Sequence, residues 1–99
     1  MLYAIMGEDV PDSGARRREM RSTHLERIRR LQDAGRLVLA GPHPAIDAPD
    51  PGPAGFTGSL IVGEFASLAD AECWAREDPY AIAGVFARVT VKPFRQVLP

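Results

Sequence analysis

Apolar and polar residues follow two different periods along the chain, and the change of period divides it into strands and helices. Short apolar runs bounded by turn-forming residues predict strands at residues 2–6, 37–40 and 59–65. Apolar residues alternate with polar ones over 86–94, which predicts a last strand there. The chain therefore supplies four strands for one sheet.

Two stretches between these strands have the spacing of apolar residues that is typical of helices. Residues 13–34 form the longer predicted helix, because Ser13 is a suitable N-cap, no proline interrupts the interior and Gly35 ends it. Residues 67–78 form the second helix, which Pro79 stops. A short turn is predicted over 80–84, before the last strand.

The order of elements is βαββαβ, which predicts a ferredoxin-like α+β fold: an antiparallel four-stranded sheet with both helices on one face. We expect a single domain over residues 1–99, since this length suffices for one core and not for two. The first three strands are apolar on both faces, although an open sheet usually has one polar face. A second copy would cover that face, so we expect a homodimer that closes into a dimeric α/β barrel.

The segment 42–58 is long for a connection and contains five prolines. A lid over a cleft, or an arm that reaches a partner subunit, would explain its length. A tolerated surface insertion without a function would explain it equally well. The sequence leaves both interpretations open.

Composition narrows the range of functions. Twelve basic and thirteen acidic residues give a net charge of −1, which does not favour nucleic-acid binding, and the arginines of the first helix are typical of a solvated face. The single cysteine, Cys73, excludes an intramolecular disulfide and a CxxC motif. No stretch has the length of a membrane span, and no signal peptide is evident. We therefore expect a cytoplasmic protein.

Two titratable residues are candidates for chemistry. Helical phase places His24 within an inward-facing sector of the first helix, together with Met20, Ile28 and Leu31. Asp78 lies at the predicted C-terminal end of the second helix, where the helix dipole does not favour a negative charge. Each has a structural alternative, a core histidine and an aspartate that caps its own turn. The topology allows the two side chains to meet.

Several short motifs resemble those of the YciI-like family. They are His24-Leu25 in the first helix, Ala40-Gly41-Pro42 after the second strand, Gly58-Ser59-Leu60-Ile61-Val62 at the third strand, and Asp78-Pro79-Tyr80 after the second helix. The resemblance spans nearly the whole chain and implies a ferredoxin-like fold that dimerises into an α/β barrel, like the muconolactone isomerases. It also implies an active site with His24 and Asp78 in a cleft, lined by Gly41, Pro42, Ser59 and Tyr80. The segment 42–58 looks expanded relative to that family.

A histidine held by a carboxylate is suited to general acid–base catalysis without a cofactor. We therefore expect proton transfer on a small cyclic or aromatic substrate, as in an isomerase, a lyase or a dehydrohalogenase. Tyr80 is a candidate donor to a developing oxyanion, and Arg17 or Arg27 is a candidate partner for a substrate carboxylate.

Two other interpretations compete with an enzyme. A metal site built from residues among His24, His43, Asp47, Asp50 and Cys73 is disfavoured, since none of the usual ligand spacings occurs. A non-catalytic dimeric module that binds a ligand or a partner protein would use His24 and Asp78 only to satisfy each other. An enzyme requires His24 at the wall of an open, partly apolar cavity, whereas a structural pair requires none.

Overall fold

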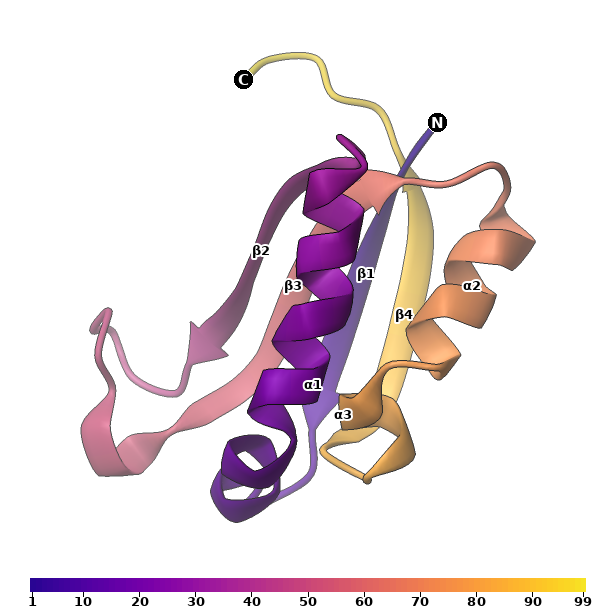
Figure 1. Ribbon diagram of the computed structural model, residues 1–99. Helices are drawn as coiled ribbons and strands as arrows, with labels where there is room; N and C mark the ends of the chain where they lie inside the picture. The colour runs from indigo at the N-terminus through magenta and orange to yellow at the C-terminus, as the bar shows by residue number, and fades with distance from the viewer.

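The computed structural model describes residues 1–99 and has the ferredoxin-like α+β architecture (Figure 1). The strands are β1 (Leu2–Asp9), β2 (Leu37–Pro44), β3 (Phe56–Glu64) and β4 (Phe86–Phe94), and the helices are α1 (Gly14–Asp33), α2 (Leu68–Arg76) and the short α3 (Pro79–Ile82). The sheet order is β2-β3-β1-β4, and every neighbouring pair is antiparallel. None of the helices combines the length and the hydrophobicity of a membrane-spanning segment.

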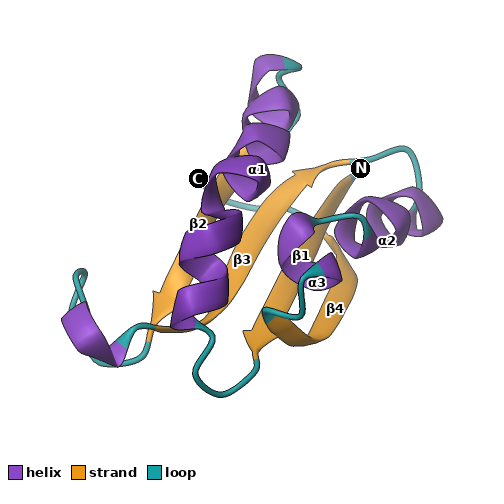
Figure 2. Ribbon diagram, turned by 60° about the horizontal axis from the view of Figure 1, so that its bottom comes forward, coloured by secondary structure: helices purple, strands orange, loops and turns teal.

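All three helices lie on the same face of the sheet, as Figure 2 shows from a second direction. The core lies between the helices and the sheet. It consists of the buried side chains of Tyr3, Ile5, Ile28, Leu31, Ile61, Phe65, Ala71 and Ala75. The alternation of burial along β1 matches the two-residue period of a strand. The two core alanines of α2 allow that helix to approach the sheet closely.

The opposite face of the sheet is not covered by any element of the chain. Leu2, Ala4 and Met6 of β1 are only partly buried there, because they alternate with the core residues. On the edge strand β2, Leu39 remains 47% exposed. The strand β4 places Thr90 and other polar residues on this face, opposite the apolar residues of β1. A largely apolar surface with one polar border is therefore accessible in a single subunit.

The connection between β2 and β3 is shorter than the sequence indicated. The second strand continues to Pro44, and β3 begins at Phe56, so residues 45–55 form the loop. Prolines fit in β2 because it is an edge strand, whose outer backbone groups need no partner within the sheet. A short 3-10 helix lies within the loop (Gly52–Ala54), and the backbone N–H of Ala45 donates to the carbonyl of Gly55.

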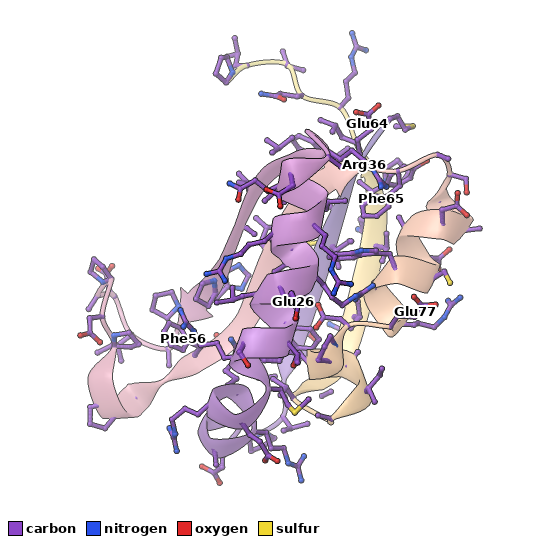
Figure 3. The ribbon with its side chains drawn as sticks, viewed as in Figure 1. Glu26, Arg36, Phe56, Glu64, Phe65 and Glu77 are labelled. Carbon is purple, nitrogen blue, oxygen red and sulfur yellow. The ribbon has the colours of Figure 1, made fainter.

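The C-terminal end of α1 is fixed to β3. Gly35 has a positive φ of 72°, and the backbone N–H of Arg36 donates to the carbonyl of Leu31, which is a Schellman motif. The guanidinium of Arg36 then donates to the backbone carbonyl of Glu64 and lies over the ring of Phe65 (Figure 3). These contacts set where the inward face of α1 lies above the sheet.

The ring of Phe86 packs directly against the backbone of Gly7 in β1. A Cβ atom at this position would lie 2.6 Å from two carbon atoms of that ring, far inside van der Waals contact. The ring of Phe86 in turn meets the ring of Tyr80 edge to face, with centroids 5.7 Å apart. The absence of a side chain at Gly7 therefore helps to position Tyr80.

We expect Gly7→Ala to lower the free energy of unfolding by about 1–3 kcal/mol, because the Phe86 ring must move out of a packed site. Urea denaturation followed by circular dichroism measures the change. Gly14→Ala is the matched control, since its Cβ would meet only the end of the flexible Arg18 side chain, and its expected effect is neutral or stabilising. Equal midpoints for Gly7→Ala and the wild type would contradict this account of Gly7.

Candidate active site

The inward face of α1 carries two polar residues among apolar ones. Arg17, His24, Ile28 and Leu31 are its buried residues, and their spacing follows the helical period. His24 is 6% exposed, in the sector that the sequence predicts. Met20, expected in the same sector, is only partly buried.

Asp78 is placed differently from the prediction. The helix α2 ends at Arg76 and is capped by Glu77, and Asp78 is the N-cap of α3, where a helix was not predicted. Its Oδ1 atom accepts a hydrogen bond of 2.9 Å from the backbone N–H of Tyr80. Negative charge is favourable at this end of a helix, so the expectation of a disfavoured carboxylate at the end of α2 was wrong.

His24 and Asp78 are in direct contact. Nδ1 of His24 lies 2.7 Å from Oδ1 of Asp78, and Asp78 is only 3% exposed. The same carboxylate oxygen thus caps α3 and holds the imidazole. Asp78 therefore caps its own turn, as the structural alternative proposed, and also pairs with His24. With Asp78 ionised, Nδ1 carries the shared proton, and the lone pair of a neutral imidazole resides on Nε2.

The ring of Tyr80 stacks on the imidazole of His24. The two ring centroids are 3.8 Å apart, and the ring planes are inclined by only 6°. The phenol hydroxyl donates to the backbone carbonyl of Arg17 at 3.3 Å, instead of facing an expected substrate oxyanion. Burial raises the pKa of Tyr80, against the opposing effect of the Arg17 and Arg21 charges, so the hydroxyl stays protonated and keeps this hydrogen bond.

A cavity of about 260 Å³ opens beside the imidazole. Its wall includes six of the expected site residues, namely Arg17, His24, Gly41, Pro42, Ser59 and Tyr80. The other lining residues are Arg21, Leu25, Ile28, Ala40 and Ile61. Nε2 of His24 has no protein partner, and no buried side-chain nitrogen or oxygen in the structure lacks one, so Nε2 retains access to this space. Asp78 lies behind the imidazole and does not line the cavity.

Arg17 is held in a buried network that sequence reasoning did not identify. Its Nε and Nη2 atoms donate to the two carboxylate oxygens of Asp9 at 2.6 and 2.9 Å, and the Asp9 side chain is 2% exposed. Nη2 also donates to Ser59 Oγ at 3.0 Å and to the carbonyl of Gly58 at 2.9 Å. Ser13 donates a further hydrogen bond to Asp9. The only signal was an acidic residue at the end of the first strand, which also fits a turn.

Arg27 does not join this cavity, contrary to the expectation that it could hold a substrate carboxylate. Its guanidinium lies 4.5 Å from the ring centroid of Trp74, and Nη1 donates to the backbone carbonyl of Trp74 at 3.0 Å. Glu77 approaches it at 3.9 Å. The side chain is therefore directed towards α2, and it lines a separate groove on that side of α1.

His43, Asp47, Asp50 and Cys73 do not converge, and no group of three or more His, Cys, Asp or Glu side chains in the structure has the arrangement of a metal site. His43, Asp47 and the neighbouring residues of the 45–55 loop instead surround a separate shallow hollow. Cys73 is exposed on α2, where its thiol donates to Glu77.

Comparison with known proteins identifies close relatives of nearly equal length. "Protein YciI" of Escherichia coli O6:H1 is 53% identical over 97 residues, which cover 98% of this chain and 99% of the relative. An uncharacterized protein of Haemophilus influenzae is 47% identical with the same coverage. Since these alignments cover nearly all of both chains, the segment 42–58 is not an insertion relative to these two proteins.

A solved structure is similar over almost the whole chain. It is 5-chloro-2-hydroxyhydroquinone dehydrochlorinase (TftG) from Burkholderia phenoliruptrix AC1100, in complex with 2,5-dihydroxybenzoquinone. The TM-score is 0.83 at 25% sequence identity, with 96% of this chain and 94% of that chain covered. A family model for the YCII-related domain matches residues 1–95. The chain therefore belongs to the YCII-related domain family, as the resemblance in its motifs predicted.

Proposed function

We propose that this protein is a small-molecule enzyme in which His24 and Asp78 transfer a proton to and from a small cyclic or aromatic substrate. The observation that carries the proposal is the opposite environment of the two imidazole nitrogens. Nδ1 is held by a buried carboxylate, whereas Nε2 has no protein partner and borders a partly apolar cavity. Isomerisation, elimination and dehydrohalogenation are the reaction classes that such a base supports.

The geometry fits a general base that later acts as a general acid. Nε2 takes a proton from a C–H or O–H bond of the substrate, and the Asp78 carboxylate stabilises the resulting imidazolium through Nδ1. In an isomerisation, the imidazolium returns the proton to another substrate atom. In a dehydrohalogenation, the electron pair left by the proton forms a double bond while the halide leaves as an anion. The stacked ring of Tyr80 keeps the imidazole plane fixed throughout.

The structural neighbour supports this choice of chemistry. Its name describes a dehydrochlorinase that acts on a chlorinated hydroquinone, and its structure contains a six-membered quinone ring. The cavity beside His24 has a volume of about 260 Å³, just below the usual range for drug-sized ligands, which suits a substrate with a single small ring. The alternative, a non-catalytic binding module, requires only that His24 and Asp78 satisfy each other and does not account for the accessible Nε2.

We also propose that two copies associate through the uncovered sheet face. Support comes from the apolar side chains of β1, β2 and β3 on that face, among them Leu39, since burying apolar surface is the main driving force of association. A second copy of the same face supplies matching apolar surface about a two-fold axis.

For catalysis, we expect His24→Asn to reduce turnover by at least 10²-fold, because the side chain that accepts the proton is lost. Chloride release from 5-chloro-2-hydroxyhydroquinone, with related chlorinated phenols as further substrates, measures turnover. The matched control is His43→Asn, since His43 is exposed and lies outside the cavity, and it should retain full activity. Undiminished turnover in His24→Asn would remove the proposed catalytic role.

For assembly, we expect the wild type to sediment as a dimer at micromolar concentration and Leu39→Glu to sediment as a folded monomer, because a charge would have to be buried at the interface. Analytical ultracentrifugation and circular dichroism together measure both properties. Leu68→Glu is the control, since Leu68 is 40% exposed on α2, away from the sheet face, and should leave the dimer intact. A folded wild-type monomer would disprove the face-to-face arrangement.

A further inference from the structure

Two hydrogen-bond donors in the cavity wall have no acceptor within the protein. The first is Nη1 of Arg17, since every hydrogen bond of this guanidinium uses Nε or Nη2. Arg17 is 8% exposed and lines the cavity beside His24, and no fully buried side-chain nitrogen lacks a partner. Nη1 therefore keeps accessible surface and is the free donor that this guanidinium can offer to a ligand.

The second donor is the hydroxyl of Ser59. Its oxygen accepts a hydrogen bond from Nη2 of Arg17 at 3.0 Å, and its own proton is donated to no protein atom. Ser59 is 5% exposed and also lines the cavity. Because Arg17 fixes the position of Oγ, the remaining O–H bond is free to rotate towards a ligand atom that also contacts Nη1.

The guanidinium itself is immobile. Asp9 binds it through two oxygens, Gly58 accepts a further hydrogen bond, and the rings of Phe56 and Tyr80 lie 5.5 and 5.1 Å from its central carbon. Donors that need no reorganisation stabilise a developing negative charge more effectively than flexible ones. Since the buried Asp9 carboxylate balances the charge of Arg17, the preference of the subsite for a negative oxygen comes from the two positioned donors and not from a net positive charge.

We propose that Nη1 of Arg17 and Oγ of Ser59 form an oxyanion subsite, which binds the ring oxygen of a small phenol or enolisable ketone while its ring faces Nε2 of His24. This inference rests on the proposed function and names its substrate class. Arg17 and His24 are two turns apart on α1 and both contact the ring of Tyr80, whose centroid lies 3.8 Å from that of the imidazole and 5.1 Å from the central carbon of the guanidinium. The two groups therefore border neighbouring parts of the same cavity wall.

The step that this arrangement supports is the formation of an enolate or phenolate. A C–H bond of the ring, adjacent to a carbonyl group, breaks, and its proton moves to Nε2 of His24. The electron pair forms a carbon–carbon double bond, and the carbonyl oxygen takes up the negative charge beside Nη1 and Oγ. When the substrate is a phenol, its O–H proton passes to solvent as it binds, and the phenolate oxygen occupies the same position beside Nη1 and Oγ. The step transfers one proton and shifts one electron pair, so it needs no oxidant or metal.

The subsite can be tested in the His24→Asn variant, which keeps the oxyanion donors and lacks the base. The probe is 4-nitrophenol, a single-ring phenol whose phenolate form is distinguished by its visible absorption. We expect bound 4-nitrophenol to be ionised at a lower pH than the free compound, because the two donors contact only the phenolate oxygen strongly. The spectrum is recorded as a function of pH at saturating protein.

Adding Ser59→Ala to this variant should weaken phenolate binding by roughly ten-fold, since one hydrogen bond to a charged oxygen is lost. Ser59→Ala removes one hydroxyl and leaves the hydrogen bonds of Arg17 to Asp9 and Gly58 in place. Ser22→Ala, at an exposed serine of α1 outside the cavity, is the matched control and should bind like the parent.

The result that would overturn the subsite is either no binding of 4-nitrophenolate at millimolar concentration or equal affinity in the Ser59→Ala and Ser22→Ala backgrounds. That failure is distinct from failure of the proposed function, which depends on turnover in the wild type and its loss in His24→Asn. If the wild type is active but the ionisation of bound 4-nitrophenol is not shifted, the proposal for the acid–base pair stands and only the oxyanion subsite is disproved.

Discussion

The hydrogen bond of 2.7 Å between Nδ1 of His24 and Oδ1 of Asp78 joins two segments that are 54 positions apart in the chain. It exists because the βαββαβ topology places α1 and α3, whose N-cap is Asp78, on the same face of the sheet (Figure 1). The carboxylate also caps α3, so moving Asp78 would disturb both the corner and the imidazole. Tyr80 belongs to the same helix α3, and its ring stacks on His24. One carboxylate therefore fixes the positions of both His24 and Tyr80 in the cavity wall.

The interior of this small domain contains more polar groups than its size would suggest. Asp9, Arg17, Ser59, His24 and Asp78 have buried side chains, and all of their buried polar atoms are paired. Burying such groups is costly unless each hydrogen bond is made, so a purely structural core would gain little from them. Arg17, His24 and Ser59 line one cavity, and Asp9 and Asp78 hold two of them in place from behind. The proposed function requires such an arrangement, because fixed donors and acceptors must face a substrate in an environment that excludes bulk water.

The fold and part of the site follow from local properties of the sequence. The order of strands and helices along the chain and the inward phase of His24 depend on periods of two and 3.6 residues, which neighbouring residues reveal. The partners of a buried arginine depend on contacts between distant segments. Arg17 and Arg27 both border the sector of His24, yet only Arg17 reaches Asp9, while Trp74 draws Arg27 towards α2. The α3 turn was likewise missed, since four residues carry no recognisable helical period.

The central claim is that Nε2 of His24 is a base that faces a ligand. Nitrogen-15 NMR of the neutral imidazole tests it most directly. The structure predicts that Nδ1 carries the proton and Nε2 does not, and that adding 2,5-dihydroxybenzoquinone changes the Nε2 resonance much more than that of Nδ1. A ring protonated on Nε2, or an Nε2 resonance that does not respond to the quinone, would contradict the account.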